Sequence, residues 1–164
     1  DHVDFLAHDQ VARAAVFGLS RSEVLPKLVD AMVALQPELI ESNSTAMVSE
    51  ISRRIRRRAL VVLLTDLNSS ALEEGLLQVL PQLSARHQVI IAAVSDPRVE
   101  EMSAGRSDAA TVYGAAAAER ARNDRRHLAG RLRNLGIEVV DAGPAELAPA
   151  LADKYLAMKA SGRL

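Results

Sequence analysis

Three aspartates each follow a short apolar segment, and they are the residues best placed for chemistry in this sequence. In chain order the pairs are Ala59–Leu64 before Asp66, Val89–Val94 before Asp96, and Ile137–Val140 before Asp141. Unbroken apolar runs of this length are typical of strands that are buried on both faces of a parallel sheet. Ligands of open α/β sheets bind beyond the carboxyl ends of the strands, so the three acids are expected to share one rim.

Asp66 is the strongest candidate for a ligand site. Asn68, Ser69 and Ser70 follow it, and together these side chains offer hard oxygen donors of the kind that magnesium and calcium prefer. A single carboxylate rarely holds a divalent ion, and either serine also suits the N-cap of a following helix. Asp96 and Asp141 have a structural interpretation as well, because an acid at a strand end often caps the next helix or stabilises a turn.

The elements that must position these acids alternate along the chain. Val3–Ala7 and Val11–Phe17 lie so close in sequence that they predict an antiparallel hairpin. Helices are expected over about Glu23–Leu35, Thr45–Arg57, Ala71–Leu83 and Ser107–Leu135, and from Pro144 to near Gly162. The order predicts a single α/β domain over residues 1–164, a three-layer fold whose mostly parallel sheet has one antiparallel edge strand.

Local signals support these boundaries. Ser22 is suited to cap the first helix, whose first turn tolerates Pro26. Ser70 and Glu73 have the spacing of a capping box. Gly136 stands where a left-handed residue would end the long alanine-rich helix.

Composition excludes several functions. The chain has no cysteine, a formal net charge of −1 and only four aromatic residues, which argues against disulfides, thiolate metal sites and nucleic-acid binding. The lack of cysteine gives no sign of an oxidising compartment and favours the cytoplasm. No apolar run approaches the roughly 20 residues of a membrane span, so this segment is expected to make no membrane contact. His2, His8, His87 and His127 lack ligand spacing, which favours surface or hydrogen-bonded positions. Phosphate-binding glycine loops and nucleophile elbows are also absent from the sequence.

A family resemblance adds to this reading. The sequence from Arg57 to Leu67 (RRALVVLLTDL), the segment Leu83–Ile90, the turn Ser95-Asp96-Pro97, and the ending Gly136–Asp141 through Tyr155 follow one another in a familiar order. They resemble a bacterial and archaeal domain-of-unknown-function family that is similar to von Willebrand factor A (vWA) domains. Its members are often encoded beside MoxR-type AAA+ ATPases. The resemblance implies a Rossmann-like, vWA-like sheet.

The resemblance also implies a metal site and shows what is missing from it. A vWA metal-ion-dependent adhesion site combines a D-x-S-x-S loop with a later threonine and a later aspartate. Thr45 resembles that threonine and Asp66 that aspartate, but no D-x-S-x-S occurs here. Magnesium is therefore expected only if residues absent from this sequence complete the site. The other interpretation takes Asp66-Leu67-Asn68-Ser69-Ser70 as a D-x-N-x-S variant.

The opening residues resemble the second strand of the family and not the first, so the domain is expected to be N-terminally truncated. The loss of a central strand predicts either direct pairing of its neighbours or a strand supplied from elsewhere. Upstream membrane helices, which are common in the family, would anchor the parent protein.

The function expected from these features is non-enzymatic protein–protein interaction, in partnership with a MoxR-type ATPase that assembles a client in a chaperone-like manner. The alternative is a metal-dependent or nucleotide-handling α/β enzyme that uses Asp66 and Asp96. The sequence leaves homo-oligomer formation open.

Overall fold

A computed structural model describes residues 2–20, 22–67, 75–99 and 109–164 of the chain. The chain divides into two compact units, Asp1–Arg54 and Ile55–Leu164. Both contain helices and strands, so the mixed α/β class is confirmed. That residues 1–164 form one domain stays a prediction.

The first unit is built on a hairpin. Strands β1 (Val3–His8) and β2 (Ala12–Leu19) pair antiparallel, as the sequence predicts. In the described residues they form a two-stranded sheet of their own, so a single mixed sheet with one antiparallel edge strand stays a prediction. The short connection explains the local pairing, because a three-residue turn brings two consecutive strands directly together.

Two helices complete this unit, α1 (Val24–Val33) and α2 (Ser44–Arg54). The predicted cap at Ser22 is wrong, since Glu23 is the N-cap residue of α1 and makes no side-chain capping bond. Helix α2 is capped instead by Asn43, whose Oδ1 accepts a hydrogen bond from the backbone N–H of Ala46 at 2.9 Å. Asparagine is among the residues preferred at this position.

Helix α2 ends at Arg54, three residues before the predicted end at Arg57. Glu50 forms ion pairs with both Arg53 and Arg54 in the last turn. Continuing the helix would place Arg57 and Arg58 four residues beyond these two arginines, and like charges at that spacing destabilise a helix.

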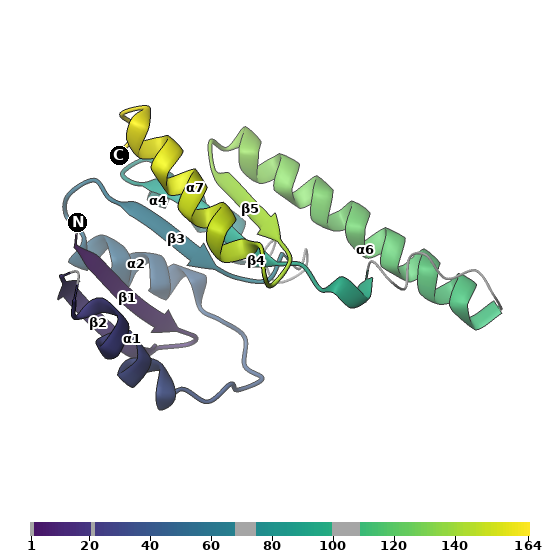
Figure 1. Cartoon of the computed structure of the whole chain (residues 1–164), viewed down its shortest axis with the longest axis horizontal. Helices are drawn as coiled ribbons and strands as arrows, with labels where there is room; N and C mark the ends of the chain where they lie inside the picture. The colour runs from purple at the N-terminus through teal and green to yellow at the C-terminus, as the bar shows by residue number, and fades with distance from the viewer. Residues whose placement is uncertain (1, 21, 68–74, 100–108) are drawn as a thin grey trace. The chain divides into compact units, whose positions relative to one another are not determined.

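The second unit holds the three predicted parallel strands. They are β3 (Leu60–Leu64), β4 (Gln88–Val94) and β5 (Glu138–Ala142), and β4 lies between the other two. Both pairs are parallel, with Val62 opposite Ile90 and Ala92 opposite Val140. The prediction of three parallel strands is confirmed, and Figure 1 shows the three arrows side by side. Burial on both faces is confirmed for β4 alone, because Val62 and Leu64 of β3 are exposed and only Val140 of β5 is buried.

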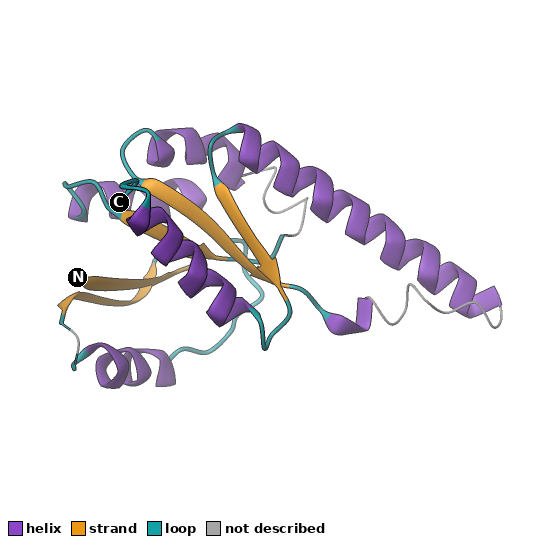
Figure 2. Ribbon diagram, turned by 45° about the horizontal axis from the view of Figure 1, so that its top comes forward, coloured by secondary structure: helices purple, strands orange, loops and turns teal. Residues whose placement is uncertain are grey.

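Helices α4 (Leu77–Ser84), α6 (Ala109–Asn134) and α7 (Leu147–Ala160) pack on this sheet. Ile90 and Val140 point to one face and form a core cluster with Met158 of α7, which lies in front of the strands in Figures 1 and 2. The next residue of β4, Ile91, points to the opposite face and is also fully buried. Burial on both faces explains why β4 reads as an unbroken apolar run.

Glycines end two of these helices. Gly136 has φ +76°, and the N–H of Ile137 donates to the carbonyl of Leu132 at 3.1 Å. This bond completes a Schellman motif. Gly162, with φ +68°, ends α7 in the same way. Both stop signals are therefore confirmed. The start of α7 is three residues later than predicted, because Pro144 lies in a turn and Leu147 is the first helical residue.

Three expectations reach residues that lie outside the described ranges. These are the capping box of Ser70 and Glu73, the D-x-N-x-S loop after Asp66, and the start of the long helix at Ser107. In the part of the chain that is described, β3 is an edge of the three-stranded sheet. The absence of a central strand, and the pairing expected to follow from it, stay predictions. None of the described helices has the length and apolar character needed to cross a membrane.

Candidate functional site

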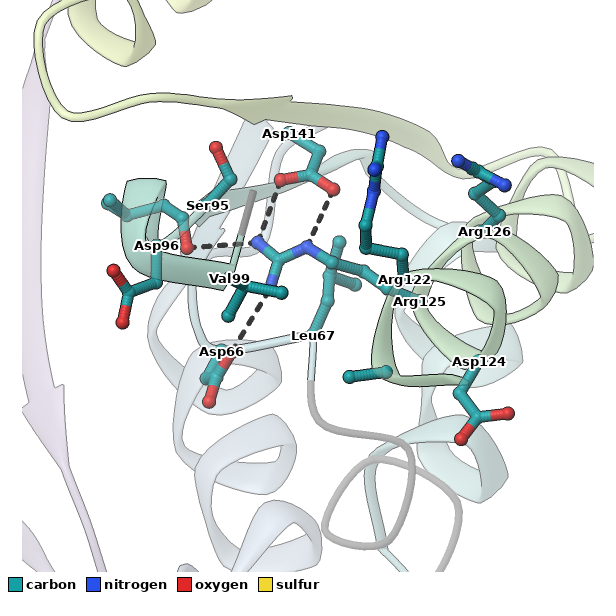
Figure 3. Close-up of a pocket in the computed structure, with 12 residues that line it drawn as sticks. Asp66, Leu67, Ser95, Asp96, Val99, Arg122, Asp124, Arg125, Arg126 and Asp141 are labelled. Carbon is teal, nitrogen blue, oxygen red and sulfur yellow. Dashed lines mark hydrogen bonds and ion pairs between the residues drawn. The ribbon is translucent and has the colours of Figure 1, made fainter. Parts of the chain in front are cut away.

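A charged pocket lies at the carboxyl ends of β3, β4 and β5, within the second unit (Figure 3). Its volume is about 700 Å³. The strands and the residues just after them contribute Asp66, Leu67, Val94, Ser95, Asp96, Val99 and Asp141, and helix α6 contributes Ala121, Arg122, Asp124, Arg125 and Arg126. The three aspartates thus share one rim, as the strand pattern predicts.

Arg125 connects all three strand ends. Its Nε and Nη2 donate to the two carboxylate oxygens of Asp141, each at 2.7 Å. This is the bidentate geometry that makes arginine–carboxylate pairs strong. Nη2 also donates to the carbonyl of Val94, the last residue of β4, at 2.9 Å. Nη1 reaches Oδ1 of Asp66, beyond β3, at 3.4 Å. One guanidinium therefore joins helix α6 to the whole carboxyl edge, as the dashed lines in Figure 3 show.

The two acids bound by Arg125 differ in strength and exposure. The Asp141 side chain is 27% exposed and the Arg125 side chain 21%. Water therefore screens their attraction only in part. The Asp66 side chain is 74% exposed and makes the longer contact. The hydrogen bonds that Arg125 donates to the Asp141 carboxylate are the main reason why the pKa of Arg125 lies above its ordinary value. The guanidinium is permanently charged.

The remaining charges of the pocket have local partners or face outward. Asp96 Oδ1 accepts a hydrogen bond from the backbone N–H of Arg98 at 2.9 Å. This bond stabilises the turn after β4. Arg126 donates to Asn123 at 3.0 Å. The Asp66 and Asp96 carboxylates project to one side of the Arg125 guanidinium in Figure 3. The structural interpretation is thus confirmed for Asp96, whereas Asp141 binds Arg125 and is no helix cap.

Thr45 and Asp66, the two residues that resemble a metal site, lie in different units. Thr45 is an exposed residue in the first turn of α2, and Asp66 follows β3. Their joint role as metal ligands stays a prediction.

The donors that are described do not fit a divalent ion. Asp66 faces a guanidinium, which repels a metal cation. Across the described residues no group of three histidine, cysteine, aspartate or glutamate side chains is arranged to hold a metal.

Sequence reasoning missed Arg125, although a signal for it exists. Ala118, Leu128 and Leu132 of α6 are buried, and Arg125 stands at helical spacing on the same stripe. A basic residue on the inward stripe of a helix needs an acidic partner, because a buried charge without one is costly. The acids at the strand ends are the partners that such reasoning would have found.

The histidine prediction is wrong for His87. This residue precedes β4, its exposed fraction is 3%, and neither ring nitrogen has a hydrogen-bond partner among the described residues. Burial lowers the pKa of His87, and the neighbouring charge of Arg86 lowers it further. The imidazole of His87 therefore stays neutral to a lower pH in the folded chain than in the unfolded chain.

Loss of stability in mild acid is the expected consequence. An unfolded histidine titrates at about pH 6.5, so protons favour the unfolded chain below that pH. The free energy of unfolding then falls with decreasing pH, with a limiting slope of about 1.4 kcal/mol per pH unit. Urea unfolding between pH 7 and pH 5 should show a shallower decline for His87→Gln than for the unsubstituted chain. His127→Gln, at an exposed position of α6, should keep the full slope. Equal slopes for all three proteins would contradict this assignment.

The fold and the pocket define a mixed α/β protein with a charged site at the carboxyl edge of a parallel sheet. Residues 5–127 match the family described as "Protein of unknown function DUF58". The match covers well over half of the 164 residues, so the chain belongs to this family. No curated protein and no solved structure gives a significant match.

Proposed function

We propose that this chain is a non-enzymatic protein-interaction domain that binds its partner at the carboxyl edge of the β3–β4–β5 sheet. The observation that carries the proposal is the presence of exposed apolar side chains beside the charged pocket. Leu64, at the end of β3, is 71% exposed, and Val94, at the end of β4, is 49% exposed.

These two residues lie on the same face of the sheet. Leu64 pairs with Ala92, and Val94 is two residues further along β4, so both side chains point to the α7 face. An apolar centre with a charged rim is the usual composition of a protein–protein interface. Leu64 and Val94 supply the apolar part here, and Asp66 and Asp96 supply charge close by.

The pocket supports binding better than catalysis. Asp96 uses one oxygen to stabilise a backbone turn, and Asp141 is held by a bidentate guanidinium, so neither is set up to transfer a proton. The described lining residues contain no histidine or cysteine. These contacts weaken the alternative of an enzyme that uses Asp66 and Asp96.

The proposed partner is a MoxR-type AAA+ ATPase, and the proposed arrangement is the three-layer sheet of a vWA-like domain that helps to assemble a client. Both rest on the family resemblance carried by the segments from Arg57 to Tyr155. Because fold analogy alone does not establish function, the partner must be tested by direct binding. The exposed rim is the surface on which such a partner would dock.

Binding of the purified MoxR-type ATPase from the same genome, followed by calorimetry, tests the proposal. Leu64→Gln combined with Asp66→Ala should weaken binding by about tenfold or more, which corresponds to about 1.4 kcal/mol. Leu156→Gln combined with Asp153→Ala is the matched control, because both residues are exposed on α7 and neither lines the pocket. Equal binding by the two double variants would rule out this rim as the docking site.

A further inference from the structure

The guanidinium of Arg125 lies between Asp66 and Asp141, in the position that a metal ion bound by both carboxylates would need. It reaches Asp141 at 2.7 Å and Asp66 at 3.4 Å, and donates to the carbonyl of Val94 at 2.9 Å. Asp66 follows β3, Asp141 belongs to the end of β5, and Val94 supplies the last carbonyl of β4. A single planar cation thus satisfies oxygen atoms from all three strand ends.

A divalent ion could not join this arrangement without displacing the guanidinium. The side chain of Arg125 is only 21% exposed. Repulsion between it and a second cation close by would therefore be weakly screened. Moving Arg125 aside would break two charge-assisted hydrogen bonds to Asp141 and leave that carboxylate, itself 27% exposed, without its partner. A charged group that loses its partner carries a larger penalty than a neutral one. Arginine stays charged throughout the pH range in which proteins fold, so deprotonation offers no route to vacate the site.

We infer that Arg125 is the permanent cation of this rim and that it keeps divalent metal ions from Asp66 and Asp141. The site is then organised by a protein side chain where an adhesion site would use magnesium. The inference concerns the chain alone and needs no partner. It is therefore independent of the outcome of the ATPase binding experiment.

Titration with Mn²⁺, followed by line broadening in ¹H–¹⁵N NMR spectra, tests the inference. Bound Mn²⁺ would broaden the backbone signals of Leu67 and Ser95, which line the pocket. The unsubstituted chain should show no saturable broadening there. Arg125→Gln removes the charge and should bind Mn²⁺ at the rim. Its affinity for Mn²⁺ should be at least about tenfold higher than the weakest affinity that the titration of the unsubstituted chain would detect, an order-of-magnitude expectation of about 1.4 kcal/mol.

Two further variants make the outcome specific. Arg125→Lys keeps a positive charge and should resist Mn²⁺ as the unsubstituted chain does. Arg126→Gln removes a neighbouring charge whose guanidinium donates to Asn123, and it should also leave Mn²⁺ unbound. Saturable broadening in the unsubstituted chain would overturn the inference, and this measurement needs no variant to fold. Equal affinity for Mn²⁺ in Arg125→Gln and Arg126→Gln would overturn it as well.

Discussion

Leu132→Ala should lower the free energy of unfolding by about 3 kcal/mol. Leu132 lies on the inward stripe of α6, and its exposed fraction is 0%. Truncation to alanine removes three buried carbon atoms and leaves a cavity in an interior that relaxes only in part. Urea unfolding at pH 7, followed by circular dichroism, would measure the loss.

Leu156→Ala is the matched control for this substitution. Leu156 lies in helix α7 and is 57% exposed. The change in side chain and in helix propensity is the same in the two variants, while burial differs. The control should lose about 0.5 kcal/mol or less. A similar loss in both variants would mean that Leu132 is not part of the packed core.

The strands of the second unit could be predicted because their signal is local and strong. β4 is buried on both faces from Val89 to Ala93, and its sequence is apolar at each of these positions. The helix ends at Gly136 and Gly162 were equally readable, since a positive φ favours glycine. In each case a feature of a few consecutive residues determines the structure.

The errors arose where the outcome depends on residues far apart in sequence. The hairpin was predicted from its short connection, but a short connection does not specify which larger sheet the two strands join. The early end of α2 is the local exception, because it follows from like charges only four residues apart, which a pattern of apolar residues does not reveal. His87 is buried next to a strand whose neighbours were not known from the sequence.

The position of the candidate site could be predicted from the sequence, but the side chain that organises it was not predicted. Asp66, Asp96 and Asp141 could be placed on one rim because parallel strands share their carboxyl edge. The residue that organises them, Arg125, lies 59 positions from Asp66 and 16 from Asp141. Its role depends on how α6 packs across the sheet, and it stands in an alanine-rich, charged segment that looks like an exposed helix. A basic residue on the buried stripe of a long helix is therefore the first candidate partner for acids at the strand ends, ahead of a metal ion.

Arg125→Met should lower the free energy of unfolding by about 2 kcal/mol. The substitution removes the bidentate partner of Asp141 and the donor to the Val94 carbonyl, while it keeps an apolar stem of similar length. Arg126→Met, which removes a charge from the same helix, should lose less than about 0.5 kcal/mol. The difference is expected because Arg126 is exposed.

A double-mutant cycle with Asp141→Asn separates the pair from its surroundings. Each single substitution leaves one charged group of the pair without its counter-ion, so the double variant should lose less than the sum of the two single losses, with a coupling of about 1 kcal/mol or more. Urea unfolding of the four proteins at pH 7 measures all terms of the cycle. Strict additivity would show that Arg125 and Asp141 do not interact in solution, and the carboxyl edge of the sheet would then lack the internal cation on which its organisation depends.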